Sequence, residues 1–122
     1  MKRVKYIVLN RTRGVCLADD AEKACSVFSR MKGLIGRTAA AFPPGTGLWI
    51  DPTDGIHTFG MRMPIDAAYL DDEGRVLRVY HALKPWRVGA IMPRARSVLE
   101  LPAGTLARAR TEVGDILEFR KT

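Results

Sequence analysis

The chain has 122 residues, of which 47% are hydrophobic and 27% are charged, and its formal net charge is +7. This size suits one domain, residues 1–122, and the composition is typical of a folded globular chain rather than a disordered or fibrous one. No apolar run approaches the roughly 20 residues that cross a bilayer, and the apolar stretch near the start is too short for a secretory signal. We therefore expect a cytoplasmic protein with reduced cysteines and no membrane partner.

The first part of the chain predicts a hairpin followed by a helix. Residues 4–9 are rich in Val, Ile and Tyr and predict a strand, with residues 14–18 as its hairpin partner. The pair Asp19–Asp20 suits a helix N-cap, and apolar residues recur at intervals of three and four over 21–31. We expect one helix with a buried stripe that ends near Lys32.

The rest of the chain predicts short strands joined by turns and loops. Prolines and glycines interrupt 38–47 and 83–93, which we expect to be irregular. The acidic run that ends at Gly74 predicts a tight hairpin connection over 71–74, and residues 105–109 predict a helical turn. Strands are expected over residues 48–50, 56–63, 65–70, 75–80, 98–101 and 116–119.

This order of elements indicates the fold class. Closely spaced strands with few helices for parallel crossovers predict an α+β, mainly antiparallel β fold. We expect a small barrel-like sheet of about seven short strands, with one helix in the N-terminal half.

Sequence motifs for several common chemistries are missing. The glycines are not followed by the Gly-Lys-Ser/Thr that binds phosphate, and no three-glycine dinucleotide fingerprint follows a strand. Cys16, Cys25, His57 and His81 have spacings that match no zinc finger or ribbon. We therefore expect neither a metal nor a cofactor.

Two stretches hold most of the excess positive charge. Residues 1–18 and 74–99 contain cations and no acids. A basic surface attracts phosphates and carboxylates at long range, which makes nucleic acid a candidate partner. Because no aromatic residues interleave to stack bases, we favour a solvated basic face over a nucleic-acid interface.

The segment 57–66 gathers polar residues in a strand-like apolar stretch. His57, Thr58, Arg62 and Asp66 each need a partner if they are buried, because an unpaired charge in a core is costly. Either Arg62 pairs with Asp66 and the other two are satisfied core residues, or the four converge on a pocket. In such a pocket His57 binds or transfers a proton and Arg62 holds an anion.

Two further places bear on this segment. The arm over 83–87 places Trp86 between Lys84 and Arg87, where the ring either covers a pocket or caps the barrel end. Glu100 would point to the opposite face from its apolar neighbours in the strand. We expect it on the surface, although an inward Glu100 could form a pair of acids with Asp66.

Several stretches carry a family resemblance. Arg-Met-Lys-Gly-Leu-Ile-Gly-Arg at 30–37, Ile-His-Thr-Phe-Gly-Met-Arg-Met-Pro-Ile-Asp-Ala-Ala-Tyr-Leu-Asp at 56–71 and Val-Leu-Glu-Leu-Pro-Ala-Gly at 98–104 resemble the family catalogued as domain of unknown function 192. The Gly74 turn and the Leu-Lys-Pro-Trp-Arg arm follow the family's order. The resemblance implies a compact, mostly β single domain with a helix near the start, and it supplies no substrate and no catalytic residue.

These observations favour a binding module for a small anionic ligand. One alternative is a hydrolase-type enzyme in which Asp66 orients His57 as a general base. The other is a basic surface for nucleic acid or protein. The ligand-binding candidates are His57, Thr58, Arg62, Asp66, Trp86 and Arg87.

Overall fold

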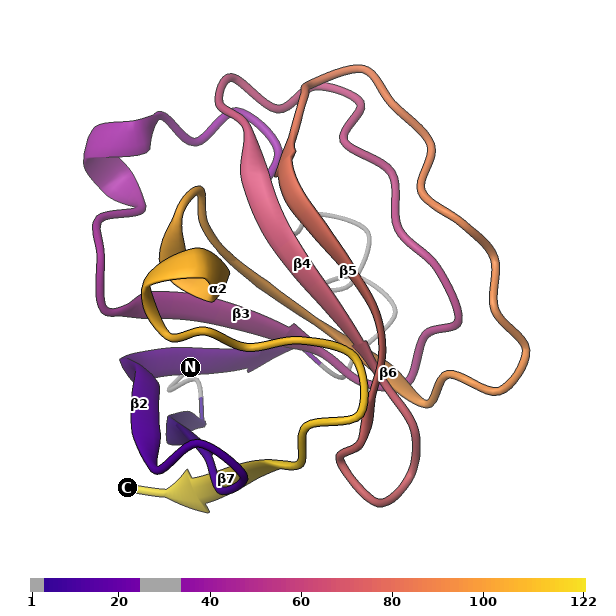
Figure 1. Ribbon diagram of the computed structural model, residues 1–122. Coiled ribbons are helices and arrows are strands. Elements are labelled where there is room, and N and C mark those ends of the chain that lie inside the picture. Colours follow the sequence, from indigo (N-terminus) through magenta and orange to yellow (C-terminus); the bar gives the residue numbers. More distant parts are fainter. Residues whose placement is uncertain (1–3, 25–33) are drawn as a thin grey trace.

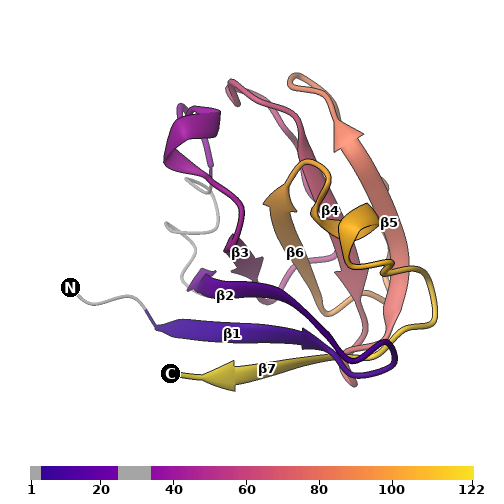
Figure 2. The same ribbon diagram turned by 60° about the vertical axis from the view of Figure 1, so that its left-hand side comes forward.

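The computed structural model describes residues 4–24 and 34–122, and its main feature is one curved sheet (Figure 1). Seven strands lie in the order β5-β4-β6-β3-β2-β1-β7 and form a half-barrel, whose curvature is clearest in Figure 2. The predicted mainly antiparallel, barrel-like sheet is confirmed. The strands are β1 (Lys5–Asn10), β2 (Val15–Ala24), β3 (Thr46–Ile50), β4 (Ile65–Leu70), β5 (Val76–Leu83), β6 (Ser97–Pro102) and β7 (Leu117–Lys121).

The pairing of the strands combines hairpins with one parallel contact. The predicted hairpins β1–β2 and β4–β5 are both present, and β6 pairs antiparallel with β3 and β4. Strand β2 runs parallel to β3, which makes the sheet mixed. Helical structure in the described ranges is limited to the 3-10 turn η1 (Ala39–Ala41) and to α2 (Thr105–Arg108), which lies within the predicted helical turn. Neither has the length and apolar character to cross a membrane.

The prediction of a helix that begins at Asp19–Asp20 is wrong at its start. Residues 19–24 continue β2, where they pair with β1 and β3. Ala21 and Ala24 are both fully buried, but they belong to core clusters on opposite faces of the sheet. The two alanines are three residues apart, as in the buried stripe of a helix, but in this strand each packs into a core on a different face of the sheet. Residues 25–33, over which the helix was expected to continue, lie outside the described residues.

The prediction of a strand over 56–63 is also wrong. One isolated antiparallel bridge joins His57 to Val88, and the chain then turns, with the Met61 N–H donating to the Thr58 carbonyl over 3.2 Å. Gly60 has a φ of +78°, which suits this turn and not a strand. The segment pairs with the irregular arm after β5 instead of joining the sheet, and Figure 1 shows the two running side by side.

Both faces of the sheet are packed. The concave face holds the main core. Every strand except β3 contributes buried side chains to this core, and α2 contributes Leu106. The other face is covered by the segment 51–64 and by residues after the undescribed stretch, including Leu34 and Phe42. Strand β4 is buried at every position because it lies between these two layers.

The two edge strands meet at one end of the half-barrel. The turn between β4 and β5 lies against the start of β7, where the Leu117 N–H donates to the Gly74 carbonyl over 2.8 Å. Arg75 and Ile116 form a bridge beside this bond, and Val76 donates to the Asp115 carbonyl over 2.8 Å. These bonds fasten the sheet edges to each other at this end.

We expect Gly74→Ala to destabilise the protein more than Gly14→Ala. Both glycines have positive φ values, +82° and +70°, so each alanine costs about 1 kcal/mol in backbone strain. A Cβ at Gly74 would also lie 2.5 Å from the Leu117 carbonyl oxygen, whereas nothing lies within 4 Å of a Cβ at Gly14. Urea unfolding should show an additional loss of about 1 kcal/mol or more for Gly74→Ala. Equal losses would mean that the close approach to β7 does not constrain the fold.

Candidate functional site

Thr58 fastens the segment before β4 to the arm after β5. Its backbone N–H donates to the Arg87 carbonyl over 2.8 Å, and its carbonyl accepts from the Trp86 N–H over 3.0 Å. Its hydroxyl donates to the Lys84 carbonyl over 2.7 Å and accepts from the Arg87 N–H over 2.8 Å. Thr58 is fully buried, so these bonds satisfy its polar atoms and fix two loops relative to each other.

Three rings from these loops form an exposed row. The centroids of His57 and Phe59 are 5.1 Å apart, and those of Phe59 and Trp86 are 6.0 Å apart. Phe59 is 43% exposed and Trp86 is 65% exposed. The Nδ1 atom of His57 accepts the Phe59 N–H over 3.1 Å, which sets the orientation of the imidazole. We call His57, Phe59 and Trp86 the aromatic row; its spacings are those of interacting aromatic pairs.

Three cations accompany the aromatic row. Lys84 and Arg87 flank Trp86 in the chain, and Arg62 follows Phe59 by three residues; all three cations are exposed. Arg87 donates to the Pro85 carbonyl over 3.3 Å. None of the three makes an ion pair with another described residue. Their charge is therefore available to an anion at the surface.

The N-terminal basic stretch is different because its described cations pair with acids. Lys5 lies 2.7 Å from Asp20, and the Arg13 guanidinium lies 3.1 Å from Asp115. Arg11 lies 3.5 Å from Glu118. These acids come from other strands and loops. The stretch has no acid of its own, so its sequence suggests more unpaired positive charge than the folded protein has.

Asp66 has a separate structural role. Its carboxylate accepts the backbone N–H groups of Ala82, Gly104 and Leu106 over 2.9, 3.1 and 2.9 Å. The residue is fully buried and ties β4 to the end of β5 and to the start of α2. The pairing of Asp66 with Arg62 that one interpretation of the sequence predicts is not formed among the residues described. The structure brings together His57, Thr58, Trp86 and Arg87, and gives Asp66 other partners.

The prediction that Glu100 lies on the surface is wrong. Glu100 is 1% exposed, and its register places it between Leu48 on β3 and Ala67 on β4. Its side chain makes no hydrogen bond or ion pair with any residue in the described ranges, and its Oε1 atom is buried without a partner there. This burial raises the pKa of the Glu100 carboxyl to about 8. The sequence alone could not locate β6 in the centre of a sheet that is covered on both faces.

Phe59 is the member of the aromatic row that the sequence analysis did not select. It alternates with His57 in the sequence, which in a strand would place it on one face with the buried methionines Met61 and Met63. The turn at Gly60 separates the exposed pair from the buried pair instead. The described residues contain no group of three or more His, Cys, Asp or Glu side chains that could hold a metal ion.

We expect Thr58→Val to lower the free energy of unfolding by about 1 to 3 kcal/mol, because the Arg87 N–H and the Lys84 carbonyl lose their hydroxyl partner. The variant Thr58→Ser keeps the hydroxyl and loses one buried methyl group, which costs about 1 kcal/mol. Chemical denaturation measures both values. If serine proves as damaging as valine, packing and not the hydrogen bonds of Thr58 holds the two loops.

We expect Glu100→Gln to remove a pH dependence of stability. The folded protein keeps a proton that the unfolded chain releases, so the contribution of Glu100 is most favourable below pH 4.5 and falls as the pH rises toward about 8. Between pH 4.5 and about pH 7 this loss is roughly 3 kcal/mol for the native glutamate and absent for glutamine. The difference between the two unfolding free energies measured across this range gives the result. Parallel curves would show that Glu100 ionises normally in the folded protein.

Comparisons with known proteins agree with the resemblance found in the sequence. A UPF0127 protein of Pyrococcus abyssi is 31% identical over 119 residues, which cover 93% of this chain and 97% of the relative. A solved structure of a protein of unknown function from Novosphingobium aromaticivorans superposes with a TM-score of 0.79 at 20% identity, over 94% of this chain and 84% of that chain.

A second solved structure, described as a candidate transcription regulator from Sinorhizobium meliloti 1021, has a TM-score of 0.77 at 24% identity, over 97% of this chain and 94% of that chain. At these identities the two structures show the fold alone. The family model of DUF192, whose members are described as uncharacterised, matches residues 8–119. Because this match covers nearly the whole chain, the protein belongs to the uncharacterised DUF192 family.

Proposed function

We propose that the protein is a binding module for a small anionic ligand that carries a planar ring, such as a nucleoside phosphate. The observation that carries this proposal is the exposed aromatic row, held on two hydrogen-bonded loops beside cations that have no acidic partner in the described chain. A cytoplasmic location, where such ligands are abundant, is part of the proposal.

The chemistry of the aromatic row suits such a ligand. A planar base can stack on the exposed indole of Trp86, and stacking of this kind contributes about 1 to 3 kcal/mol per base. Arg87 presents a guanidinium that can bind two phosphate oxygens at once, and the exposed cations Lys84 and Arg62 lie within three residues of the aromatic row in the sequence. His57 supplies a further hydrogen-bonding group at the other end of the row.

The rigidity of the loops also supports binding. Trp86 has a φ of 62°, a left-handed conformation that costs a non-glycine residue about 1 kcal/mol or more. The hydrogen bonds from Trp86 and Arg87 to Thr58 hold this conformation. A ligand would therefore meet rings whose backbone is already ordered, which reduces the entropy lost on binding.

The alternative enzyme has less support. A hydrolase in which Asp66 orients His57 needs a free carboxylate oxygen near the imidazole. Both oxygens of Asp66 accept backbone N–H groups from Ala82, Gly104 and Leu106, and Nδ1 of His57 accepts the Phe59 N–H. A single-stranded nucleic acid would use the same rings and cations as a nucleotide, and a longer oligonucleotide in the titrations below tests that reading.

Titration calorimetry with AMP, adenosine and ribose 5-phosphate tests the proposal. AMP should bind, and each of the other two should bind more weakly because adenosine lacks the phosphate and ribose 5-phosphate lacks the base. Trp86→Gly removes the ring and relieves the left-handed backbone, so it should fold and weaken AMP binding about tenfold. Arg87→Gln should weaken binding and also reduce its dependence on salt.

Arg75→Gln is the matched control for the lost charge. Arg75 is exposed in the turn at the opposite end of the β4–β5 hairpin from the aromatic row, as Figure 1 shows for the two ends of these strands. This variant should bind AMP as the native protein does. The proposal fails if the folded native protein does not bind AMP, or if Trp86→Gly binds AMP as tightly as the native protein. A single-stranded oligonucleotide is titrated under the same conditions, and binding of the oligonucleotide without binding of AMP would favour a nucleic-acid interface instead.

A further inference from the structure

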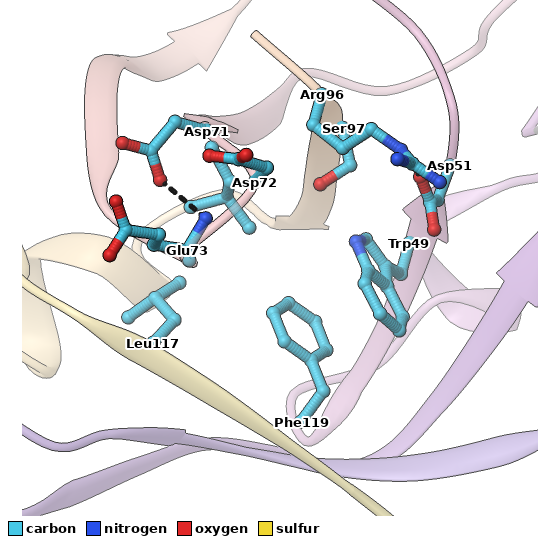
Figure 3. A pocket seen from close by; sticks show the side chains of 11 residues that line it. Trp49, Asp51, Asp71, Asp72, Glu73, Arg96, Ser97, Leu117 and Phe119 are labelled. Atoms are coloured by element: carbon cyan, nitrogen blue, oxygen red, sulfur yellow. Dashed lines mark hydrogen bonds and ion pairs between the residues drawn. The ribbon is translucent and has the colours of Figure 1, made fainter.

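A pocket of about 360 Å³ lies at the end of the half-barrel where β7 meets the β4–β5 turn (Figure 3). Its walls come from the acidic turn Asp71–Gly74, from β7 and from the adjoining ends of β3 and β6. This volume falls in the range of small-molecule sites, and the mouth of a β-barrel is a common place for them. The pocket and the aromatic row lie at opposite ends of the β4–β5 hairpin.

One wall of the pocket is strongly acidic. Asp71, Asp72 and Glu73 make no ion pair with any described residue, and the Asp71 carboxylate accepts only the backbone N–H groups of Glu73 and Arg75 within the described chain. A fourth carboxylate, Asp51, is already neutralised, since it lies 2.8 Å from Arg96 and 3.4 Å from Lys23. In a chain with a net charge of +7, this wall is a local excess of negative charge.

The opposite wall offers hydrogen-bonding groups without partners. Ser97 is 3% exposed, and its hydroxyl makes no hydrogen bond with any residue that the structure describes. In Figure 3 this hydroxyl points into the space between Trp49 and the acidic turn. The Nε1 atom of Trp49 is buried and has no partner among the described residues, whereas the Ser97 hydroxyl oxygen keeps some exposed surface. Polar groups in a pocket are normally satisfied, so a ligand with an acceptor atom would supply a partner for the Ser97 hydroxyl and for the Trp49 indole N–H.

Apolar side chains lie between these two walls. Phe119 stacks on Trp49 with a centroid distance of 3.9 Å and an interplanar angle of 17°, and Leu70 and Leu117 also line the pocket. An alkyl chain that connects a cation to an acceptor would remove apolar surface from water here, at about 25 cal/mol per Å². The lining therefore alternates acidic, apolar and donor surfaces across the pocket.

We propose that this pocket binds a small organic cation, an alkylammonium or alkylguanidinium that also carries a carbonyl acceptor. The cation lies beside the Asp72 carboxylate, Glu73 adds negative charge from the same turn, and the carbonyl accepts from Ser97 and Trp49. The alkyl chain crosses Leu70, Leu117 and Phe119. This site is independent of the aromatic row and has the opposite charge preference.

N-acetylcadaverine is a suitable probe because it carries an ammonium and an amide carbonyl at the two ends of an alkyl chain. At millimolar concentration it should shift the indole N–H signal of Trp49 in ¹H–¹⁵N NMR spectra; the Trp86→Gly variant, which keeps a single indole, assigns this signal. N-pentylacetamide lacks the ammonium and pentylamine lacks the carbonyl, so each should bind about fivefold or more weakly.

The double variant D72N/E73Q tests the acidic wall, and D19N/D54N is its matched control. All four side chains are exposed, and none accepts a hydrogen bond within the described chain, so both variants should fold. D72N/E73Q should bind the probe about fivefold or more weakly and still bind AMP, whereas D19N/D54N should bind the probe as the native protein does. An unshifted Trp49 signal, equal binding of N-pentylacetamide, or equal effects of the two double variants overturns the proposal.

Discussion

The structure depends on the burial of β4 and β6 on both faces at the centre of the sheet. Every residue of β4 is buried, and five of the six residues of β6 are buried. The concave core with α2 covers one face, and the segment between β3 and β4 covers the other with Met61 and Met63. Because that segment must lie across the sheet, it cannot add to the sheet as a strand, and its turn is left to contact the arm after β5.

The same burial sorts the acidic residues into two kinds. Asp66 faces backbone N–H groups at the start of α2 and the end of β5, and three hydrogen bonds compensate for the loss of water. The Glu100 side chain lies in the row between Leu48 and Ala67, and its carboxyl has no partner among the residues described. A neutral carboxyl is the form that a site of this kind favours, which explains the raised pKa of Glu100.

The β4–β5 hairpin also separates two surfaces of opposite charge. At one end the connecting loops present the aromatic row and the cations Lys84 and Arg87. At the other end the turn presents Asp72 and Glu73 beside the pocket. The net charge of +7 describes neither surface, because it is a sum over the whole chain, whereas the unpaired cations and the acidic turn lie at different ends of the hairpin. Any ligand recognition is therefore set locally, by the loops at each end of two rigid strands.

The sequence by itself determined the elements whose signals are local. Alternating β-formers and turn residues such as Gly74 correctly predicted the hairpins, and the motifs at 56–71 and 98–104 correctly indicated the family. Tertiary structure decided what depends on neighbours distant in the chain. Ala21 and Ala24 have helical spacing but serve cores on two faces of a strand, and Glu100 is buried because β6 lies between β3 and β4. The physical reason is that the spacing of apolar residues in a sequence shows only which side chains avoid water. Strand order and the packing of layers determine whether one face or both faces of a strand are buried.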